Sequence, residues 1–250
     1  MSAPLTIAID GPSGSGKSSV SRAVARALGV GFLDTGAMYR ALTWWCLERD
    51  IDLTDADAVA AAARDLPLAV GTDPDAPTVS VAGTDISQAI RTTRVSTSVS
   101  AVATNLEVRA ELQQRQRDLM AQIAQETGGV VAEGRDITTV VAPDASVRVL
   151  LTASEEARLR RRSAELHGST DAAAVEATRD QVVRRGRDDS TVSTFTEAAP
   201  GVVLVDTSDL DFDQSVAAVL AVVTAQTSAC RGARGRRQHS RPRKGPAWPA

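Results

Sequence analysis

The sequence contains few aromatic residues, few cysteines and few histidines. Only 3% of its 250 residues are Phe, Trp or Tyr, so its core must be built from alanine, valine, leucine and isoleucine. The two cysteines, Cys46 and Cys230, lie far apart in different sequence contexts, which argues against a disulfide framework and favours free thiols. Neither cysteine has neighbours at metal-ligand spacing and the two histidines are isolated, so a zinc site is not expected.

Long apolar stretches are absent as well. No run approaches the length that spans a bilayer, and the N-terminus lacks the charged and apolar segments of a secretory signal. Hydrophobic residues make up 43% and charged residues 24%, which is the balance of an ordinary soluble globular protein. We therefore expect a cytoplasmic protein with no membrane contact and with one large or two small domains.

Acidic residues are missing from the C-terminal segment, residues 227–250. This segment holds seven of the chain's 28 basic residues, which leaves 21 basic against 31 acidic residues in residues 1–226 and a net charge of about −10 there. The segment is rich in glycine, proline and serine, and we expect it to be a disordered tail. A nucleic-acid-binding role and a passive extension are both open for it.

Short apolar runs alternate with amphipathic segments along residues 1–226. The runs that read as buried strands are residues 5–10, 31–34, 130–132, 147–151 and 202–205. The segments with helical periodicity are residues 20–28, 38–49, 56–63, 92–125, 154–166 and 212–226. This alternation predicts an α/β fold with three layers, in which helices cover both faces of a parallel five-stranded sheet. Residues 68–70, 78–81 and 85–86 predict a small β insertion.

Residues 11–18 read GPSGSGKS and match the phosphate-binding P-loop pattern G-x-x-x-x-G-K-[ST]. The motif lies between a predicted strand and a predicted helix, where its backbone N–H groups can surround a phosphate and the helix dipole favours negative charge. Lys17 would reach the β- and γ-phosphates, and Ser18 would bind the accompanying Mg²⁺. The alternative is an ordinary glycine-rich turn. The residues expected to bind the triphosphate are Gly11, Pro12, Ser13, Gly14, Ser15, Gly16, Lys17, Ser18 and Ser19.

Beyond the P-loop, the sequence has no N-K-x-D guanine-specificity segment. It also has no usual Walker-B strand, although residues 130–133, an apolar run that ends in Glu, could have a related role. Arginines occur instead in four separate places. They are Arg40, Arg109, Arg135 and the group Arg184, Arg185 and Arg187. Guanidinium groups suit bidentate phosphate contacts, so several arginines beyond one P-loop indicate a second phosphorylated substrate. The alternative, a solvated helix face, stays open for Arg40 and Arg109.

Three separated motifs resemble those of the bacterial cytidylate kinases, which transfer a phosphoryl group from ATP to CMP or dCMP. The motifs are IAIDGPSGSGKSS at residues 7–19, LDTGAMYRA at residues 33–41 and EGRDITTVVAPDA at residues 133–145. The β insertion is similar to the enlarged monophosphate-binding region of that family. The resemblance covers about residues 4–226. It implies a P-loop kinase domain over residues 1–226, with the insertion at about 64–95 and a mobile lid at about 183–198.

By position, the resemblance implies an acceptor site. Thr35, Tyr39 and Arg40 would hold the monophosphate and its nucleoside, Arg109 would clamp the monophosphate, Arg135 would contact the pyrimidine or the phosphate, and Ser100 and Asp136 would hydrogen-bond cytosine. Asp136 can accept a hydrogen bond from the exocyclic amine of cytosine, which uracil replaces by a carbonyl group. The alternatives are a helix surface for Ser100 and a structural ion pair with Arg135 for Asp136.

On the ATP side, the resemblance implies that Arg158 and Arg161 line the nucleotide site. Glu133 lies at the end of a predicted strand and would hold a magnesium-bound water. The alternative for Glu133 is that it caps a loop.

The lid departs from the family's usual pattern, R-D-x-x-D-S-x-R. Residues 185–192 read RGRDDSTV, so Gly186 replaces the first Asp and Val192 replaces the last Arg. A lid with one arginine fewer should stabilise the transferring phosphoryl group less, unless Arg187 or Arg184 takes that role. The lid residues expected to act in catalysis are Arg185, Arg187 and Asp189.

The resemblance implies phosphoryl transfer from ATP, with Mg²⁺ as cofactor, to CMP or dCMP. We expect a direct in-line transfer in which Lys17 and the lid arginines offset the charge on the γ-phosphoryl group. The expected partners are these small substrates, with nucleic acid conceivable only through the basic tail, and the enzyme is expected to act as a monomer. Two alternatives stay open: a kinase for another small acceptor such as UMP, and a regulatory or RNA-associated P-loop module that uses the tail.

Overall fold

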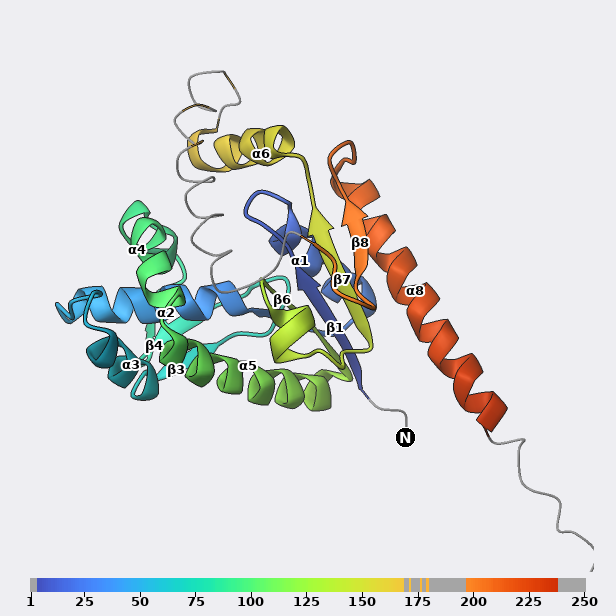
Figure 1. Ribbon diagram of the computed structural model, residues 1–250, viewed down its shortest axis with the longest axis horizontal. Coiled ribbons are helices and arrows are strands. Elements are labelled where there is room, and N and C mark those ends of the chain that lie inside the picture. The colour runs from blue at the N-terminus through green and yellow to red at the C-terminus, as the bar shows by residue number, and fades with distance from the viewer. Residues whose placement is uncertain (1–3, 169–170, 172–175, 177–178, 180–196, 238–250) are drawn as a thin grey trace, which may run out of the picture.

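The computed structural model describes residues 4–168, 171, 176, 179 and 197–237 (Figure 1). The predicted lid at about 183–198 therefore falls almost entirely outside the described residues. Residues 238–250 of the predicted tail fall outside them as well.

A five-stranded parallel sheet forms the centre of the fold (Figure 1). In spatial order its strands are β2 (Gly31–Asp34), β6 (Gly129–Gly134), β1 (Leu5–Asp10), β7 (Val147–Thr152) and β8 (Val203–Asp206). The central strand β1 pairs with β6 along its whole length, from Leu5 opposite Gly129 to Asp10 opposite Gly134. All adjacent strands run parallel, so their carboxyl ends meet at one edge. This confirms the predicted α/β class and its parallel sheet.

Helices cover both faces of this sheet. They are α1 (Lys17–Leu28) and α8 (Phe212–Arg237) on one face, with α5 (Leu106–Thr127) and the π-helix η2 (Ile137–Val141) on the other. Side chains alternate along β1, so Ile7 and Ile9 pack against the first pair of helices while Ala8 faces the second. Full burial of each isoleucine contributes about 1.5–3 kcal/mol.

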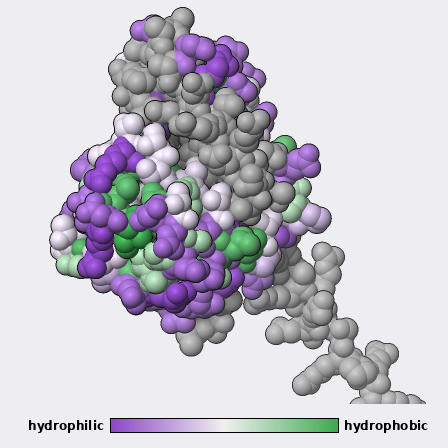
Figure 2. Space-filling view, turned by 60° about the vertical axis from the view of Figure 1, so that its left-hand side comes forward, coloured by the Kyte–Doolittle hydropathy of each residue, from purple (hydrophilic) through white to green (hydrophobic). Residues whose placement is uncertain are grey.

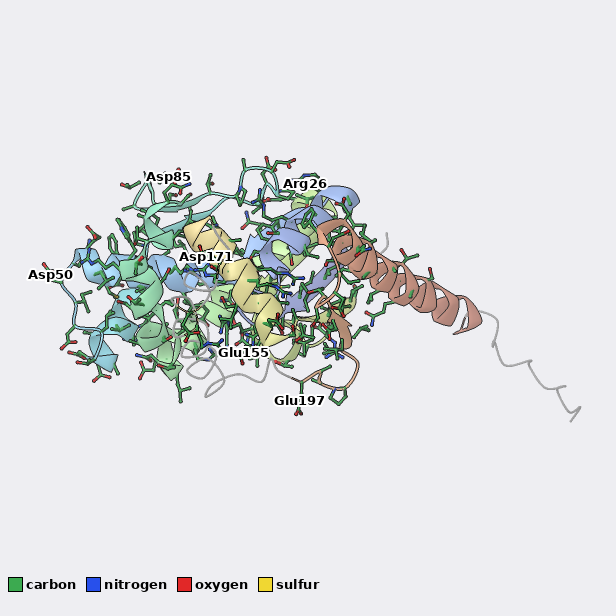
Figure 3. All side chains as sticks on the ribbon, turned by 90° about the horizontal axis from the view of Figure 1, so that it is seen from above. Arg26, Asp50, Asp85, Glu155, Asp171 and Glu197 are labelled. Carbon is green, nitrogen blue, oxygen red and sulfur yellow. The ribbon has the colours of Figure 1, made fainter. Side chains whose placement is uncertain are left out.

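A second group of elements forms the predicted β insertion and its neighbours. They are α2 (Thr35–Glu48), α3 (Ala56–Arg64), β3 (Leu68–Val70), β4 (Val79–Val81), β5 (Thr84–Asp85), η1 (Ala89–Arg91) and α4 (Thr93–Ala103). The three strands form a separate antiparallel sheet. Figure 3 places Asp50 and Asp85 at the end of the molecule away from α8. Helix α5 joins this group to the main sheet, because Leu112 lies in the insertion's apolar cluster and Met120 in the sheet's.

A loop of the insertion reaches back to the helix that follows the P-loop. Arg22 Nε of α1 donates to the carbonyl oxygen of Pro74 at 2.8 Å, and Arg26 pairs with the Asp75 carboxylate. The backbone N–H of Phe32, on the edge strand β2, donates to the carbonyl oxygen of Thr72 at 2.8 Å. The insertion is therefore bound to both the sheet edge and α1.

The C-terminal part of the fold consists of α6 (Glu155–His167), β8 and α8. Helix α8 continues to Arg237, so it extends into residues 227–250, the segment predicted to be a disordered tail. None of the helices in the described part of the chain has the length and apolar character needed to cross a membrane.

The molecular face in Figure 2 is largely hydrophilic, with apolar residues gathered in a smaller group. The large apolar side chains that are exposed among the described residues are Leu106, Val140, Leu204 and Phe212.

Candidate active site

One cavity of about 830 Å³ lies at the carboxyl edge of the main sheet. The loop after β1, the start of α2 after β2 and the segment after β6 all line it, as do the insertion and the loop before α8. Ligands of open α/β sheets bind at this edge. The predicted site residues that line the cavity are Pro12, Ser13, Gly14, Ser15, Gly16, Lys17, Ser18, Ser19, Thr35, Tyr39, Arg40, Arg109, Glu133, Arg135, Asp136 and Arg161.

The P-loop has the backbone geometry of an anion-binding turn. Gly14 and Gly16 adopt positive φ angles of 80° and 85°, which other residues rarely adopt. A Cβ atom at Gly14 would lie 2.6 Å from the carbonyl oxygen of Arg158, so only glycine lets α6 pack this closely against the loop. Gly16 is the N-cap of α1 and has no side chain to bind the first amides of the helix. Those amides are available to a phosphate.

Glu133 lies beside the two polar residues at the start of α1. Ser18 Oγ donates a hydrogen bond to Glu133 Oε1 at 2.5 Å, and Lys17 Nζ lies 3.4 Å from Glu133 Oε2. Burial raises the pKa of the Glu133 carboxyl, and the nearby Lys17 ammonium opposes that rise. Hard oxygen ligands of this kind suit Mg²⁺, which also takes phosphate and water oxygens. The arrangement fits a magnesium ion carried by a nucleoside triphosphate.

The residues after β2 are held in place by local hydrogen bonds. Asp34 caps α2, because its Oδ1 accepts from the backbone N–H of Ala37 at 2.9 Å. Thr35 Oγ1 donates to the carbonyl oxygen of Glu133 at 2.7 Å, and a Cβ atom at Gly134 would lie 2.5 Å from that hydroxyl oxygen. Arg40, one turn further along α2, donates to Ser96 Oγ of α4 at 3.1 Å. These contacts fix the residues after β2 in the wall of the cavity.

Asp136 is bound from α5. Arg109 Nη2 lies 2.6 Å from Asp136 Oδ2, and Gln113 Nε2 donates to the same oxygen at 2.8 Å. The side chains of Arg109 and Asp136 are 11% and 7% exposed, so neither lies on a solvated surface. Asp136 therefore forms its ion pair with Arg109 of α5, whereas sequence reasoning had considered its neighbour Arg135.

Positive charge dominates the cavity. The arginines that line it are Arg22, Arg40, Arg91, Arg109, Arg135, Arg161 and Arg162. Burial, together with the nearby charge of Arg40, lowers the pKa of Arg135 to about 10. Burial likewise lowers the pKa of Arg40, with Arg162 and Arg91 adding to the effect. Mutual repulsion among these guanidinium groups is relieved when an anion binds between them.

Several predicted residues lie elsewhere. Ser100 is next to Val99 on α4, but Val99 lines the cavity and Ser100 does not. Gly11 lies against the carbonyl oxygen of Leu151 on β7. Arg158 packs against Gly14, and its buried Nε has no hydrogen-bond partner among the described residues. The predicted lid residues Arg185, Arg187 and Asp189 lie outside the described residues.

Sequence reasoning missed some of the residues that organise the site. Gln113 lies one helical turn after Arg109, and that spacing is a signal that could have identified it. Arg161 was predicted, but its anchor Thr207 was not: Arg161 donates to Thr207 Oγ1 at 3.0 Å and to the carbonyl oxygen of Ser15 at 3.4 Å. Nothing in the sequence near Thr207 indicates this contact.

The chain is similar to known proteins over most of its length. A family model described as "Cytidylate kinase" matches residues 7–225. A cytidylate kinase from Streptomyces avermitilis is 48% identical over 224 residues, which cover 89% of this chain and 94% of that protein. Another, from Cutibacterium acnes, is 50% identical over 222 residues, which cover 88% and 96%. A solved gluconokinase structure from Sinorhizobium meliloti 1021 aligns with a TM-score of 0.46 and 17% identity, over 92% of this chain and 98% of that chain.

Proposed function

The chain belongs to the cytidylate kinase family, and on that premise we propose how its cavity binds the two substrates and transfers the phosphoryl group. The protein is a nucleotide-binding transferase that phosphorylates CMP with ATP. One observation carries the proposal: the P-loop and the pair formed by Asp136 and Arg109 line the same cavity. A triphosphate on the loop then faces a nucleotide held by the pair.

ATP binds with its β- and γ-phosphates at the N-terminus of α1. Backbone amides of the P-loop donate to the phosphate oxygens, and the Lys17 ammonium neutralises part of their charge. Ser18, with Glu133 through a water, would hold Mg²⁺, which neutralises developing negative charge during the transfer. Because Lys17 lies 3.4 Å from Glu133, the loop already has its charged groups in place before ATP arrives.

CMP binds on the opposite side of the cavity. Asp136 accepts a hydrogen bond from the exocyclic amine of cytosine, while uracil would present a carbonyl oxygen to the same carboxylate. Arg40, Arg109 and Arg135 supply cationic contacts for the monophosphate, and Thr35 adds a hydroxyl group. We extend this binding mode to dCMP, because none of these contacts requires the ribose 2′-hydroxyl group.

The transfer itself needs alignment and charge neutralisation. The acceptor phosphate is already ionised near neutral pH, so no general base is required. Lys17 and the cavity arginines stabilise charge on the γ-phosphoryl group as it moves, and the lid residues Arg185, Arg187 and Asp189 are proposed to add to this effect. We propose that the enzyme acts as a monomer, because the P-loop and the acceptor-side arginines that the proposed transfer needs line one cavity of a single chain. The similarities favour neither another small acceptor nor an RNA-associated module.

The proposal is tested by comparing acceptors in the wild-type enzyme and in Asp136→Asn. Initial rates with CMP, dCMP and UMP give a ratio of kcat/KM for CMP to that for UMP. We expect this ratio to fall at least about tenfold in Asp136→Asn, because an amide can donate to the uracil carbonyl and no longer discriminates by charge. Asp118→Asn, an exposed carboxylate on the same helix as Arg109, is the matched control and should leave the ratio unchanged. An unchanged ratio in Asp136→Asn contradicts the proposed recognition.

A further inference from the structure

Asp10 is a buried carboxylate that the proposed mechanism does not use. It ends strand β1, immediately before the P-loop, and it is 2% exposed. Its oxygens accept three hydrogen bonds from the first two residues of η2. These are from Ile137 N at 2.9 Å, Thr138 N at 2.8 Å and Thr138 Oγ1 at 2.6 Å. Asp10 thus binds the N-terminus of η2 from a strand more than a hundred residues away in the sequence.

Because Asp10 accepts from the η2 amides, the Asp136 carboxylate is available for other contacts. An aspartate immediately before a helix commonly caps that helix with its own side chain. Asp136 holds that position before η2, yet it makes no such bond, and Asp10 accepts from the η2 amides in its place. The Asp136 carboxylate turns instead to Arg109 and Gln113. Both of those bonds reach Oδ2, and no described residue donates to Oδ1, so Oδ1 is free to accept from a ligand.

The hydrogen bonds from η2 to Asp10 are not needed to hold β1 beside β6, the strand that precedes η2. Strands β1 and β6 already pair at six successive positions, from Leu5 to Asp10 on β1. Burial raises the pKa of the Asp10 carboxyl to about 6 although its three hydrogen bonds lower it, so a charged form is held there against a desolvation penalty. A simple structural link would avoid that penalty with an uncharged side chain.

We propose that Asp10, acting through Thr138, is a positioning residue that orients the Asp136 carboxylate and thereby sets the preference for cytosine over uracil. This inference rests on the proposed role of Asp136 in base recognition. With Asp10 absent, the η2 amides lose their acceptor and Asp136 becomes the nearest side chain able to cap them. A carboxylate that turns back to cap its own helix no longer faces the base.

The test uses Thr138→Val, which keeps the side-chain shape and removes the hydroxyl donor to Asp10. We expect the ratio of kcat/KM for CMP to that for UMP to fall about tenfold, with KM for ATP changed less than about twofold, since one charge-assisted hydrogen bond is lost on the acceptor side. Thr138→Ser restores the hydroxyl group and should restore the ratio. Asp10→Asn should lower the ratio further, because its amide group cannot accept all three bonds.

Thr127→Val is the matched control. The Thr127 hydroxyl also links backbone groups, accepting from Gly31 N at 3.0 Å and donating to the carbonyl oxygen of Gly129 at 2.6 Å. These residues start β2 and β6, at the edge of the sheet opposite to the cavity. Thr127→Val should lower the urea midpoint and leave the acceptor ratio unchanged.

The outcomes separate base recognition by Asp136 from the positioning of Asp136 by Asp10 and Thr138. If Thr138→Val lowers kcat/KM for CMP and UMP by the same factor, Asp10 and Thr138 act only in stability and the inference is wrong. If both Thr138→Val and Asp10→Asn leave the ratio intact while Asp136→Asn lowers it, base recognition by Asp136 stands and the positioning role fails. If Asp136→Asn leaves the ratio intact, the proposed recognition itself fails, whatever Thr138→Val does.

Discussion

Lys17 is one of two lysines in a chain with 28 lysine and arginine residues, and the other, Lys244, lies in the C-terminal segment. Cationic contacts in the cavity otherwise come from arginine, whose planar fork matches a phosphate held in one orientation. An ammonium group is a compact point charge that can follow a phosphoryl group as it moves. In the proposed mechanism, the position where charge migrates during transfer is thus the one with a lysine.

Replacing Lys17 by alanine tests this division of roles. We expect Lys17→Ala to lower kcat by about 10²–10³-fold, because a preorganised charge at the transferring group is lost. The dissociation constant for CMP should be unchanged, because Lys17 faces Glu133 and the donor loop. Steady-state rates and calorimetric titration with CMP measure the two effects, with Lys244→Ala as the control. A variant that turns over at the wild-type rate would contradict the assigned role of Lys17.

At the residue scale, short sequence motifs identified residues that the structure brings together, while the roles of these residues stay predictions. The P-loop residues from Pro12 to Ser19 line the cavity, and so do Thr35 and Asp136. Asp10 was not singled out, because in the sequence it is only the polar end of an apolar run. Its hydrogen bond to Ile137 spans 127 positions, and periodicity carries no information on a contact of that separation.

At the scale of elements, the start of α5 determines where Arg109 lies. Asn105 caps this helix, because its Oδ1 accepts from the backbone N–H groups of Glu107 and Val108 at 3.0 and 3.3 Å. The Asn105 amide group also donates to the carbonyl oxygen of Ala56 at 2.9 Å, which ties the helix start to α3. Arg109 follows in the first turn and Gln113 in the next. The cap therefore holds the partners of Asp136 as well as the helix.

We expect Asn105→Ala to reduce the free energy of unfolding by about 1 kcal/mol, the usual cost of losing an N-cap. KM for CMP should rise, because the first turn of α5 frays and Arg109 lies within it. Urea denaturation and steady-state kinetics measure the two effects. Asn105→Asp keeps a capping oxygen and loses the donor to Ala56. It should therefore retain most of the free energy of unfolding and a KM for CMP close to that of the wild type. Equal losses in the two variants would show that the contact with α3, rather than the cap, holds the helix.

Prediction of elements succeeded for strands and was less complete for helix ends. Each predicted strand of the main sheet is present, since buried β-branched runs between glycines have few other interpretations. The helical region at 92–125 is divided at Asn105 into α4 and α5, a break that the uniform helical composition conceals. Helix α8 passes residue 226 although residues 227–237 contain two glycines, so composition alone did not indicate where this helix ends.

At the scale of the whole molecule, the C-terminal end of α8 extends away from the sheet (Figure 1). The buried contacts of this helix are made earlier, by Val219 and Val223, which are at most 4% exposed. Gln226 Oε1 accepts from the backbone N–H of Arg148 at 3.4 Å. Among the described side chains, the fully buried contacts of α8 therefore precede the boundary that we predict at 226.

Truncation tests this boundary. We expect a chain of residues 1–226 to keep its free energy of unfolding within about 0.5 kcal/mol and to keep kcat/KM for CMP, because the described buried side chains of α8 lie before residue 227. A chain of residues 1–237 should behave in the same way. Val219→Ala in the full chain, as a positive control, should lose about 2 kcal/mol, because it empties part of the core. A stability loss in 1–226 that is absent from 1–237 would place residues 227–237 within the folded domain.

The strand order of the main sheet bears on how the protein is made. Strand β1 leaves the ribosome first, yet its neighbours β6 and β7 begin at Gly129 and Val147. At a synthesis rate of about 5–20 residues per second, β1 waits roughly 6–25 s for β6. During that time Ile7 and Ile9 have no sheet to join, and an unpaired apolar strand is a site of aggregation. Binding of a chaperone to β1 in the nascent chain would protect the strand on which the rest of the sheet assembles.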